Sequence, residues 1–209
     1  MGWSPPGRNC GACGLADCDA FVAAVKTGNN QDTDCPFYDG SDNLKGYCPT
    51  FQECRYSDTD ILGNPYDFIL MPFPGEVSAR KILLPFRPDL VEKWAIAPGD
   101  ILTGRPMGAG CPVQHVLAVI SASMVSGVIT CHVVGPAYSR GKVVKDLEAY
   151  HMIGFEGIAV PVLGDPVFGK RMRFLPGFCM MNVTHTGVVN FVATTDEGIR
   201  VRVEDIVLL

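Results

Sequence analysis

The sequence predicts a mainly β chain of the α+β class, in which a small cysteine-rich segment with one short helix precedes an antiparallel, barrel-like β-domain. Two observations predict this organisation. Beyond about residue 60, short apolar runs typical of strands alternate with turn residues, whereas the first 60 residues are rich in Cys, Gly, Asn and Asp. We therefore expect two domains, residues 1–60 and residues 61–209.

The expected elements follow from local patterns. The turn residues that start at Thr27-Gly28 end a short helix over Cys18–Lys26. Further helices are expected at about 89–94 and 143–151. A hairpin turn at 195–198 joins the final two strands. The predicted strands are 68–71, 81–84, 115–120, 128–134, 187–192 and 199–203.

Four cysteines near the N-terminus carry the strongest chemical signal. Cys10, Cys13, Cys18 and Cys35 follow the spacing C-x2-C-x4-C-x16-C. Three thiolates from one tight loop and a fourth from a remote position suit the four corners of a [4Fe–4S] cluster. Gly11 and Gly14 allow the loop to fold closely around such a cluster and to point backbone N–H groups at its sulfides.

Zinc is the main alternative, because four-cysteine zinc sites also begin with a C-x2-C pair. Zinc ribbons usually offer two separated pairs, whereas three of these cysteines lie within nine residues, between Cys10 and Cys18. The spacing favours iron and sulfide over zinc, and a disulfide scaffold is the third alternative.

The same residues resemble a known family. The run Asn9-Cys10-Gly11-Ala12-Cys13-Gly14, then Cys18 and the helical Phe21–Val25, is similar to the small Fe–S domain of two anaerobic systems. These are the large subunit of the corrinoid iron–sulfur protein and the B subunit of Rnf-type ferredoxin:NAD oxidoreductases. The resemblance covers about residues 5 to 40. It implies that the cysteines at positions 10, 13, 18 and 35 bind one low-potential [4Fe–4S] cluster that relays single electrons in anaerobic, one-carbon-type metabolism.

A cluster with four thiolate ligands has no open iron site, so we expect outer-sphere electron transfer instead of substrate binding. Four nearby carboxylates oppose added negative charge and favour a low potential. They are Asp17, Asp19, Asp32 and Asp34.

Composition excludes several classes. The formal net charge of −5 and the absence of a Lys/Arg cluster argue against nucleic acid. No apolar run is long enough for a membrane span, and the N-terminus lacks the apolar core of a signal peptide, so a cytoplasmic protein is expected. Only 19% of residues are charged, which is compatible with a homo-oligomer or a subunit of a complex.

A second set of sulfur and imidazole groups lies in the β-domain. Its members are Cys111, His115, Cys131, Cys179 and His185. These residue types suit zinc or iron, so a second metal site is one interpretation. Buried structural roles are the other, since Cys131 and the adjacent His132 point to opposite faces of a strand and cannot easily share an ion.

Two further features stay open at this stage. The glycines between Gly104 and Gly110, around Arg105, predict a donor-rich loop for an anionic group such as that of a flavin. Cys48 and Cys54 are unassigned: Cys48-Pro49 repeats the Cys35-Pro36 pair, and structural thiols are the simpler interpretation.

Three functions are consistent with these patterns. The first is a single-electron carrier that docks a redox partner protein. The second is a redox enzyme or subunit whose β-domain holds a second metal or a flavin fed by the cluster. The third is a non-redox module in which the cluster only stabilises the N-terminal segment.

Overall fold

The computed structural model describes residues 5, 7, 11, 13–35, 58–177 and 181–209. Two α-helices, α1 (Cys18–Lys26) and α2 (Asp89–Lys93), and two 3₁₀ turns, η1 (Asp32–Asp34) and η2 (Pro136–Ser139), lie in these ranges. The strands are β1 (Phe68–Met71), β2 (Arg80–Pro85), β3 (Ile101–Met107), β4 (His115–Ala122), β5 (Ile129–Val134), β6 (Val144–Pro161), β7 (Arg171–Pro176), β8 (His185–Thr195) and β9 (Gly198–Leu208).

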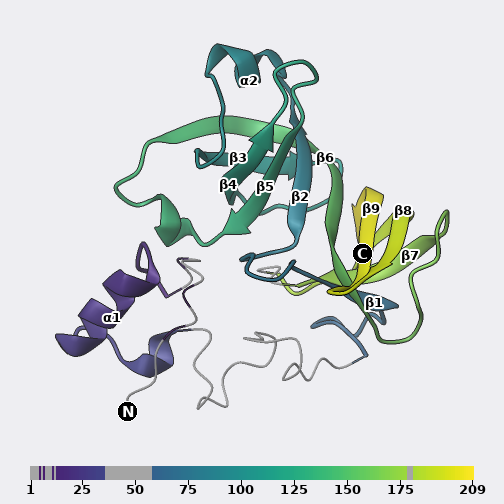
Figure 1. Cartoon of the computed structure of the whole chain (residues 1–209), viewed down its shortest axis with the longest axis horizontal. Helices are drawn as coiled ribbons and strands as arrows, with labels where there is room; N and C mark the ends of the chain where they lie inside the picture. Colours follow the sequence, from purple (N-terminus) through teal and green to yellow (C-terminus); the bar gives the residue numbers. More distant parts are fainter. Residues whose placement is uncertain (1–4, 6, 8–10, 12, 36–57, 178–180) are drawn as a thin grey trace.

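The strands of the described residues form one nine-stranded sheet in the order β1-β7-β8-β9-β6-β2-β5-β4-β3, with additional pairings of β6 to β1 and to β3. The two strands at the ends of this order, β1 and β3, therefore both pair with β6. The result is two lobes that share the long strand β6, as Figure 1 shows. We call them the β7–β9 lobe, which includes β1, and the β2–β5 lobe.

Glycines make the sharing of β6 possible. A Cβ atom on Gly154 would lie 2.5 Å from the carbonyl oxygen of Val203 on β9, and one on Gly157 would overlap the carbonyl oxygen of Met71 on β1. Backbone approaches this close admit no side chain. Residues 154 and 157 are thus fixed as glycine by the packing of neighbouring strands on β6.

Each lobe has its own apolar core. In the β7–β9 lobe, Phe174 stacks on Phe68 and meets Phe155 edge to face, with ring centroids 5.8 Å apart in both pairs. In the β2–β5 lobe, Leu83 and Tyr150 pack among strands β3, β4 and β5. Both side chains are fully buried. The two cores account for most of the apolar burial that holds residues 58–209 together.

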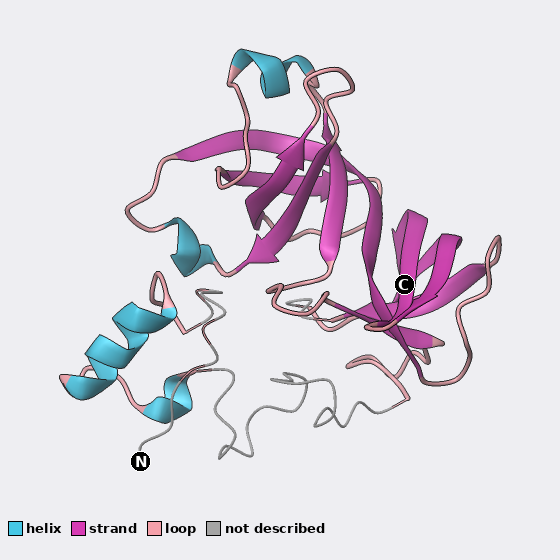
Figure 2. Cartoon of the chain, in the orientation of Figure 1, coloured by secondary structure: helices cyan, strands magenta, loops and turns pink. Residues whose placement is uncertain are grey.

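The mainly β class is confirmed, as are helix 18–26, the short helix near residue 89 and the hairpin turn at 195–198. Each of the six predicted strands lies wholly or almost wholly within an observed one. Strands dominate the described residues (Figure 2). Their sheet returns to β6 from both ends of the strand order, and it departs from the antiparallel expectation in two parallel pairings, β1 with β7 and β3 with β6. The domain boundary near residue 60 stays a prediction, because residues 36–57 lie outside the described ranges.

The helix expected at 143–151 is wrong, since these residues begin β6. Leu147 and Tyr150 are three positions apart and both buried, which is a helical spacing. In the structure, Glu148 has a φ of 57° and the register with β3 shifts nearby. This bulge turns both apolar side chains to the same side of a strand.

The region of the predicted Gly104–Gly110 loop also differs. Residues up to Met107 form strand β3, paired with β4 and β6, and only the residues after it form a loop. Within the ranges that the structure describes, no helix combines the length and the apolarity needed to cross a membrane.

Candidate functional site

The N-terminal loop turns tightly before α1. Gly11 and Gly14 both have a positive φ, and the N–H of Gly14 donates to the carbonyl oxygen of Gly11 at 3.1 Å. Asp17 then caps the helix by accepting a hydrogen bond from the N–H of Ala20 at 2.7 Å. As a result, Cys18 is the first residue of α1, directly beyond the turn that carries Cys13.

Cys13 and Cys35 are brought to the same small apolar core. Cys35 follows η1 and is buried with Phe21 of α1, and Cys13, Leu15 and Val25 pack against this pair. The fourth predicted ligand, Cys10, lies outside the described residues. Thiol donors on a turned glycine loop, beside an apolar wall that excludes water, form a donor set that fits an iron–sulfur cluster.

The loop docks onto η2, the short turn that follows β5. A Cβ atom at Gly11 would lie 2.6 Å from the backbone nitrogen of Tyr138, so only glycine fits at this contact. The Arg140 guanidinium donates to the carbonyl oxygen of Gly14, and Lys142 lies over the Tyr138 ring at 3.4 Å from its centroid. Residues of η2 and the turn after it therefore hold the cysteine loop against the β2–β5 lobe (Figure 1).

Comparisons with known proteins agree with this geometry. A family model described as "Putative Fe-S cluster" matches residues 6–37, the segment that contains the four predicted cysteines. The chain is also 34% identical over 213 residues to the uncharacterized protein MJ0119 of Methanocaldococcus jannaschii, and the match covers 96% of this chain and 88% of that protein. The chain belongs to the same family as that protein. No solved structure matches the chain.

The N-terminal segment is thus an Fe–S domain of the matched family, as its cysteine spacing predicts. The relative's printed name assigns no activity. The β-domain contains a second candidate site.

A pocket lies where the two lobes meet beside β6. Its lining includes His115 and Lys81 from the β2–β5 lobe and His185 from the β7–β9 lobe, together with Cys111. His115 is central to the polar contacts: its Nδ1 lies 3.0 Å from Lys81 Nζ and 2.7 Å from the Tyr150 hydroxyl, and its Nε2 lies 3.8 Å from Cys111 Sγ.

Burial sets the protonation of these groups. It lowers the pKa of His115 to about 3, and the neighbouring positive charge of Lys81 acts in the same direction. Burial also lowers the pKa of His185 to about 4, despite the hydrogen bond from this ring to the Val183 carbonyl. Burial raises the pKa of Tyr150. Both imidazoles are therefore neutral at pH 7, and the phenol is protonated.

The structure brings together part of the second set predicted from sequence. Cys111 and His115 are neighbours, and His185 lines the same pocket. Cys131 lies instead in the core of the β2–β5 lobe, where its thiol donates to the Lys81 carbonyl and burial raises its pKa to about 12. Cys179 lies outside the described residues, as do Cys48 and Cys54.

Metal ligation by the second set stays a prediction. Among the residues that the structure describes, no group of three or more His, Cys, Asp or Glu side chains is arranged to hold a metal ion. As expected from strand alternation, His132 points away from Cys131. Its Nδ1–H donates to the Ser78 carbonyl at 3.0 Å.

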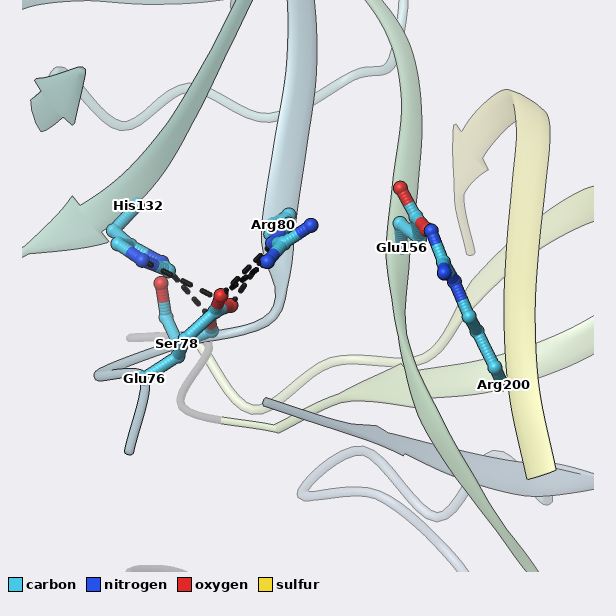
Figure 3. Close-up of polar contacts among 6 residues, drawn as sticks. All are labelled: Glu76, Ser78, Arg80, His132, Glu156 and Arg200. Carbon is cyan, nitrogen blue, oxygen red and sulfur yellow. Dashed lines mark hydrogen bonds and ion pairs between the residues drawn. The ribbon is translucent and has the colours of Figure 1, made fainter. Parts of the chain in front are cut away.

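A polar network holds the β1–β2 connection beside the pocket (Figure 3). Arg80 forms a bidentate pair with Glu76, and Ser78 Oγ accepts from the N–H of Val133 at 3.1 Å. Arg200 pairs with Glu156, and the guanidinium groups of Arg80 and Arg200 both lie over the Phe73 ring. These contacts fix residues 76–80 and with them the Ser78–Ala79 wall of the pocket.

Sequence reasoning missed Lys81 and Tyr150. A signal for Lys81 was present: it lies two residues before Leu83 in a strand, so both side chains face the same side, and Leu83 is fully buried. A lysine on the buried face of an apolar strand is uncommon. Tyr150 was missed because its segment was assigned to a helix.

Proposed function

We propose that this protein carries single electrons at low potential on one [4Fe–4S] cluster, held by Cys10, Cys13, Cys18 and Cys35. The observation that carries the proposal is the family match over residues 6–37, which contains all four cysteines at the spacing of a cubane site. Such a cluster supplies reversible one-electron chemistry when bound.

The chain's own residues have defined tasks in this function. Phe21 and Leu15 shield the ligand loop from water, which tunes the potential together with charge and hydrogen bonds to sulfur. Gly11 and Gly14 turn the backbone tightly, which allows the loop to fold closely around a cluster. Tyr138 and Arg140 hold the loop on the β2–β5 lobe. We also propose that the cluster exchanges electrons with a redox partner protein in anaerobic metabolism, as the resemblance implies.

The first test is the iron, sulfide and zinc content of anaerobically purified protein, with an EPR spectrum after reduction by dithionite. We expect about four irons and about four sulfides per chain and one reversible paramagnetic signal of low midpoint potential. The Cys18→Ala variant should lose both. The matched control, Cys111→Ala, removes another half-buried cysteine and should keep both.

Two results would overturn the proposal. Zinc in place of iron and sulfide would make the site structural. A cluster that shows no reversible redox step would assign the module a stabilising role alone. Replacing Cys35 and Cys48 separately by Ala identifies the fourth ligand, because only loss of that ligand abolishes the signal.

A further inference from the structure

No carboxylate neutralises the charge of Arg140 among the residues that the structure describes. Its guanidinium donates to the carbonyl oxygen of Gly14 and takes part in no ion pair there. Most other arginines of the described ranges do pair with carboxylates: Arg80, Arg87, Arg171, Arg200 and Arg202. A carbonyl group accepts a hydrogen bond but carries no net charge, so the positive charge of Arg140 stays uncompensated at this contact.

This charge lies next to a predicted cluster ligand. Gly14 directly follows Cys13, which packs against the small core that contains Cys35. Because consecutive Cα atoms are about 3.8 Å apart, the guanidinium lies within about 10 Å of the Cys13 side chain. A unit charge still acts on another at that distance, since the Debye length is about 10 Å at 0.1 M salt.

Lys142 adds a second cation to the same turn. Its ammonium lies 3.4 Å from the centroid of the Tyr138 ring, and the backbone of Tyr138 is the contact surface for Gly11. The N-terminal segment itself carries carboxylates on both sides of Cys18 and before Cys35, namely Asp17, Asp19, Asp32 and Asp34. The β2–β5 lobe therefore presents positive charge to a loop whose own segment is acidic.

We propose that Arg140 stabilises the reduced cluster and so raises its midpoint potential above the value that the acidic segment alone would give. This inference rests on the proposed function. Reduction adds one electron, so the net charge of the cluster and its four thiolates becomes more negative by one unit. A fixed cation beside the ligand loop favours that state, because the potential of an iron–sulfur cluster depends on nearby charge. Arg140 acts through its charge and is not a ligand.

Reciprocity gives a second expected effect. If contact with Arg140 favours reduction by some factor, reduction strengthens that contact by the same factor. The turn offers backbone amides as a readout, since the N–H of Tyr138 donates to the Gly135 carbonyl at 3.0 Å and that of Arg140 to the Ala137 carbonyl at 3.1 Å. We expect reduction of the wild type to slow amide exchange in residues 136–142 at least about twofold.

A redox titration of the full-length, cluster-loaded protein, followed by EPR, measures the effect of the charge. Arg140→Gln retains a side-chain N–H donor and removes the charge. At the potential where the wild type is half reduced, the ratio of oxidised to reduced cluster in this variant should be at least about twofold higher than in the wild type. Added salt should diminish the difference, because Arg140 is exposed. Arg140→Lys keeps the charge and should titrate close to the wild type.

Arg173→Gln is the matched control. Arg173 is an exposed arginine on β7, in the other lobe, and its replacement changes the net charge of the chain equally. The control should titrate as the wild type does. Iron content and thermal unfolding show whether each variant is loaded and folded. The exchange measurement uses only the wild type, so it tests the inference even if Arg140→Gln loses the cluster.

The inference is overturned if Arg140→Gln titrates as the wild type, if Arg140→Lys shifts as far as Arg140→Gln, or if Arg173→Gln shifts equally. Wild-type exchange in residues 136–142 that is the same in both redox states overturns it as well. These outcomes leave electron transfer by the cluster intact. A wild type without a reversible redox step instead overturns the proposed function, and this inference with it.

Discussion

The N-terminal segment and the β-rich part of this protein are stabilised in different ways. Among residues 11 and 13–35, the buried apolar core consists of Phe21 and Cys35, with three partly buried neighbours. Residues 58–177 and 181–209 instead bury two large cores and close their strands on β6. So small a core among the described residues predicts that the N-terminal segment needs bonds to a bound group for its fold, whereas the β-rich part is held by apolar burial.

Replacing a buried phenylalanine by alanine in each region should distinguish the two modes of stabilisation most clearly. Phe174→Ala removes a fully buried ring from the β7–β9 lobe and should cost about 3 to 5 kcal/mol in the free energy of unfolding. Phe21→Ala should leave the unfolding of the strands unchanged and cause loss of iron. Urea unfolding followed by circular dichroism, with iron content in parallel, measures both.

The comparison fails if Phe21→Ala destabilises the strands as much as Phe174→Ala does. That result would mean that the two regions unfold as one cooperative unit.

A single substitution at Gly11 should weaken the contact between the N-terminal loop and the β2–β5 lobe. Gly11→Ala places a methyl group against the backbone of Tyr138 and also strains a φ of 69°. Gly28→Ala meets no atom within 4 Å and strains a similar φ of 75°, so it is the matched control. Each change costs about 1 kcal/mol or more in backbone strain, and only Gly11→Ala adds the clash.

We therefore expect Gly11→Ala, and not Gly28→Ala, to speed hydrogen exchange in η2 and to reduce iron retention. Equal exchange in the two variants would contradict the docking of the loop on Tyr138. Hydrogen exchange read by mass spectrometry, on protein purified without oxygen, provides the measurement.

Acid should destabilise the β-rich part by protonating the buried carboxylate of Asp60. Burial of Asp60 opposes its ionisation, but hydrogen bonds from Thr184 and Asn64 outweigh this and lower its pKa from 3.8 to about 2. Because the folded-state pKa is depressed, the ionised group stabilises the fold above about pH 4. This contribution, about 2 kcal/mol, is lost as the pH falls from about 4 to 2.

Urea unfolding at pH 5 and pH 2 checks this expectation. The free energy of unfolding of the wild type should fall by about 2 kcal/mol more than that of Asp60→Asn over this interval. Asp165→Asn, in the exposed loop between β6 and β7, should behave as the wild type. An Asp60→Asn variant with the full pH dependence of the wild type would show that other carboxylates are responsible.

The parts of the fold that could be predicted are those set by short-range patterns. The run of Phe68–Met71 is apolar throughout and forms a strand buried on both faces. The helix at Cys18–Lys26 has its cap and its stop signal in adjacent residues. The segment after Val143 was wrongly predicted as a helix, because a bulge at Glu148 gives this strand the apolar spacing of a helix. Such a bulge depends on the partner strand.

The same distinction applies to the sites. The cysteine spacing alone indicated an Fe–S domain, because three thiolates in one loop are a local property, and the family match agrees. The pocket joins Lys81, His115 and His185 from strands far apart in the chain. The composition of the second set pointed to some of these residues but not to the lysine beside them.

By itself, the sequence determined the mainly β class, the short helix and the Fe–S character of the N-terminal segment, since periodicity, caps and ligand spacing act over a few residues. Tertiary structure alone decided the sharing of β6 by two lobes, the docking of Gly11 on Tyr138 and the placement of Lys81 against His115. These features depend on strand register and on close contacts between residues distant in sequence, which no local pattern encodes.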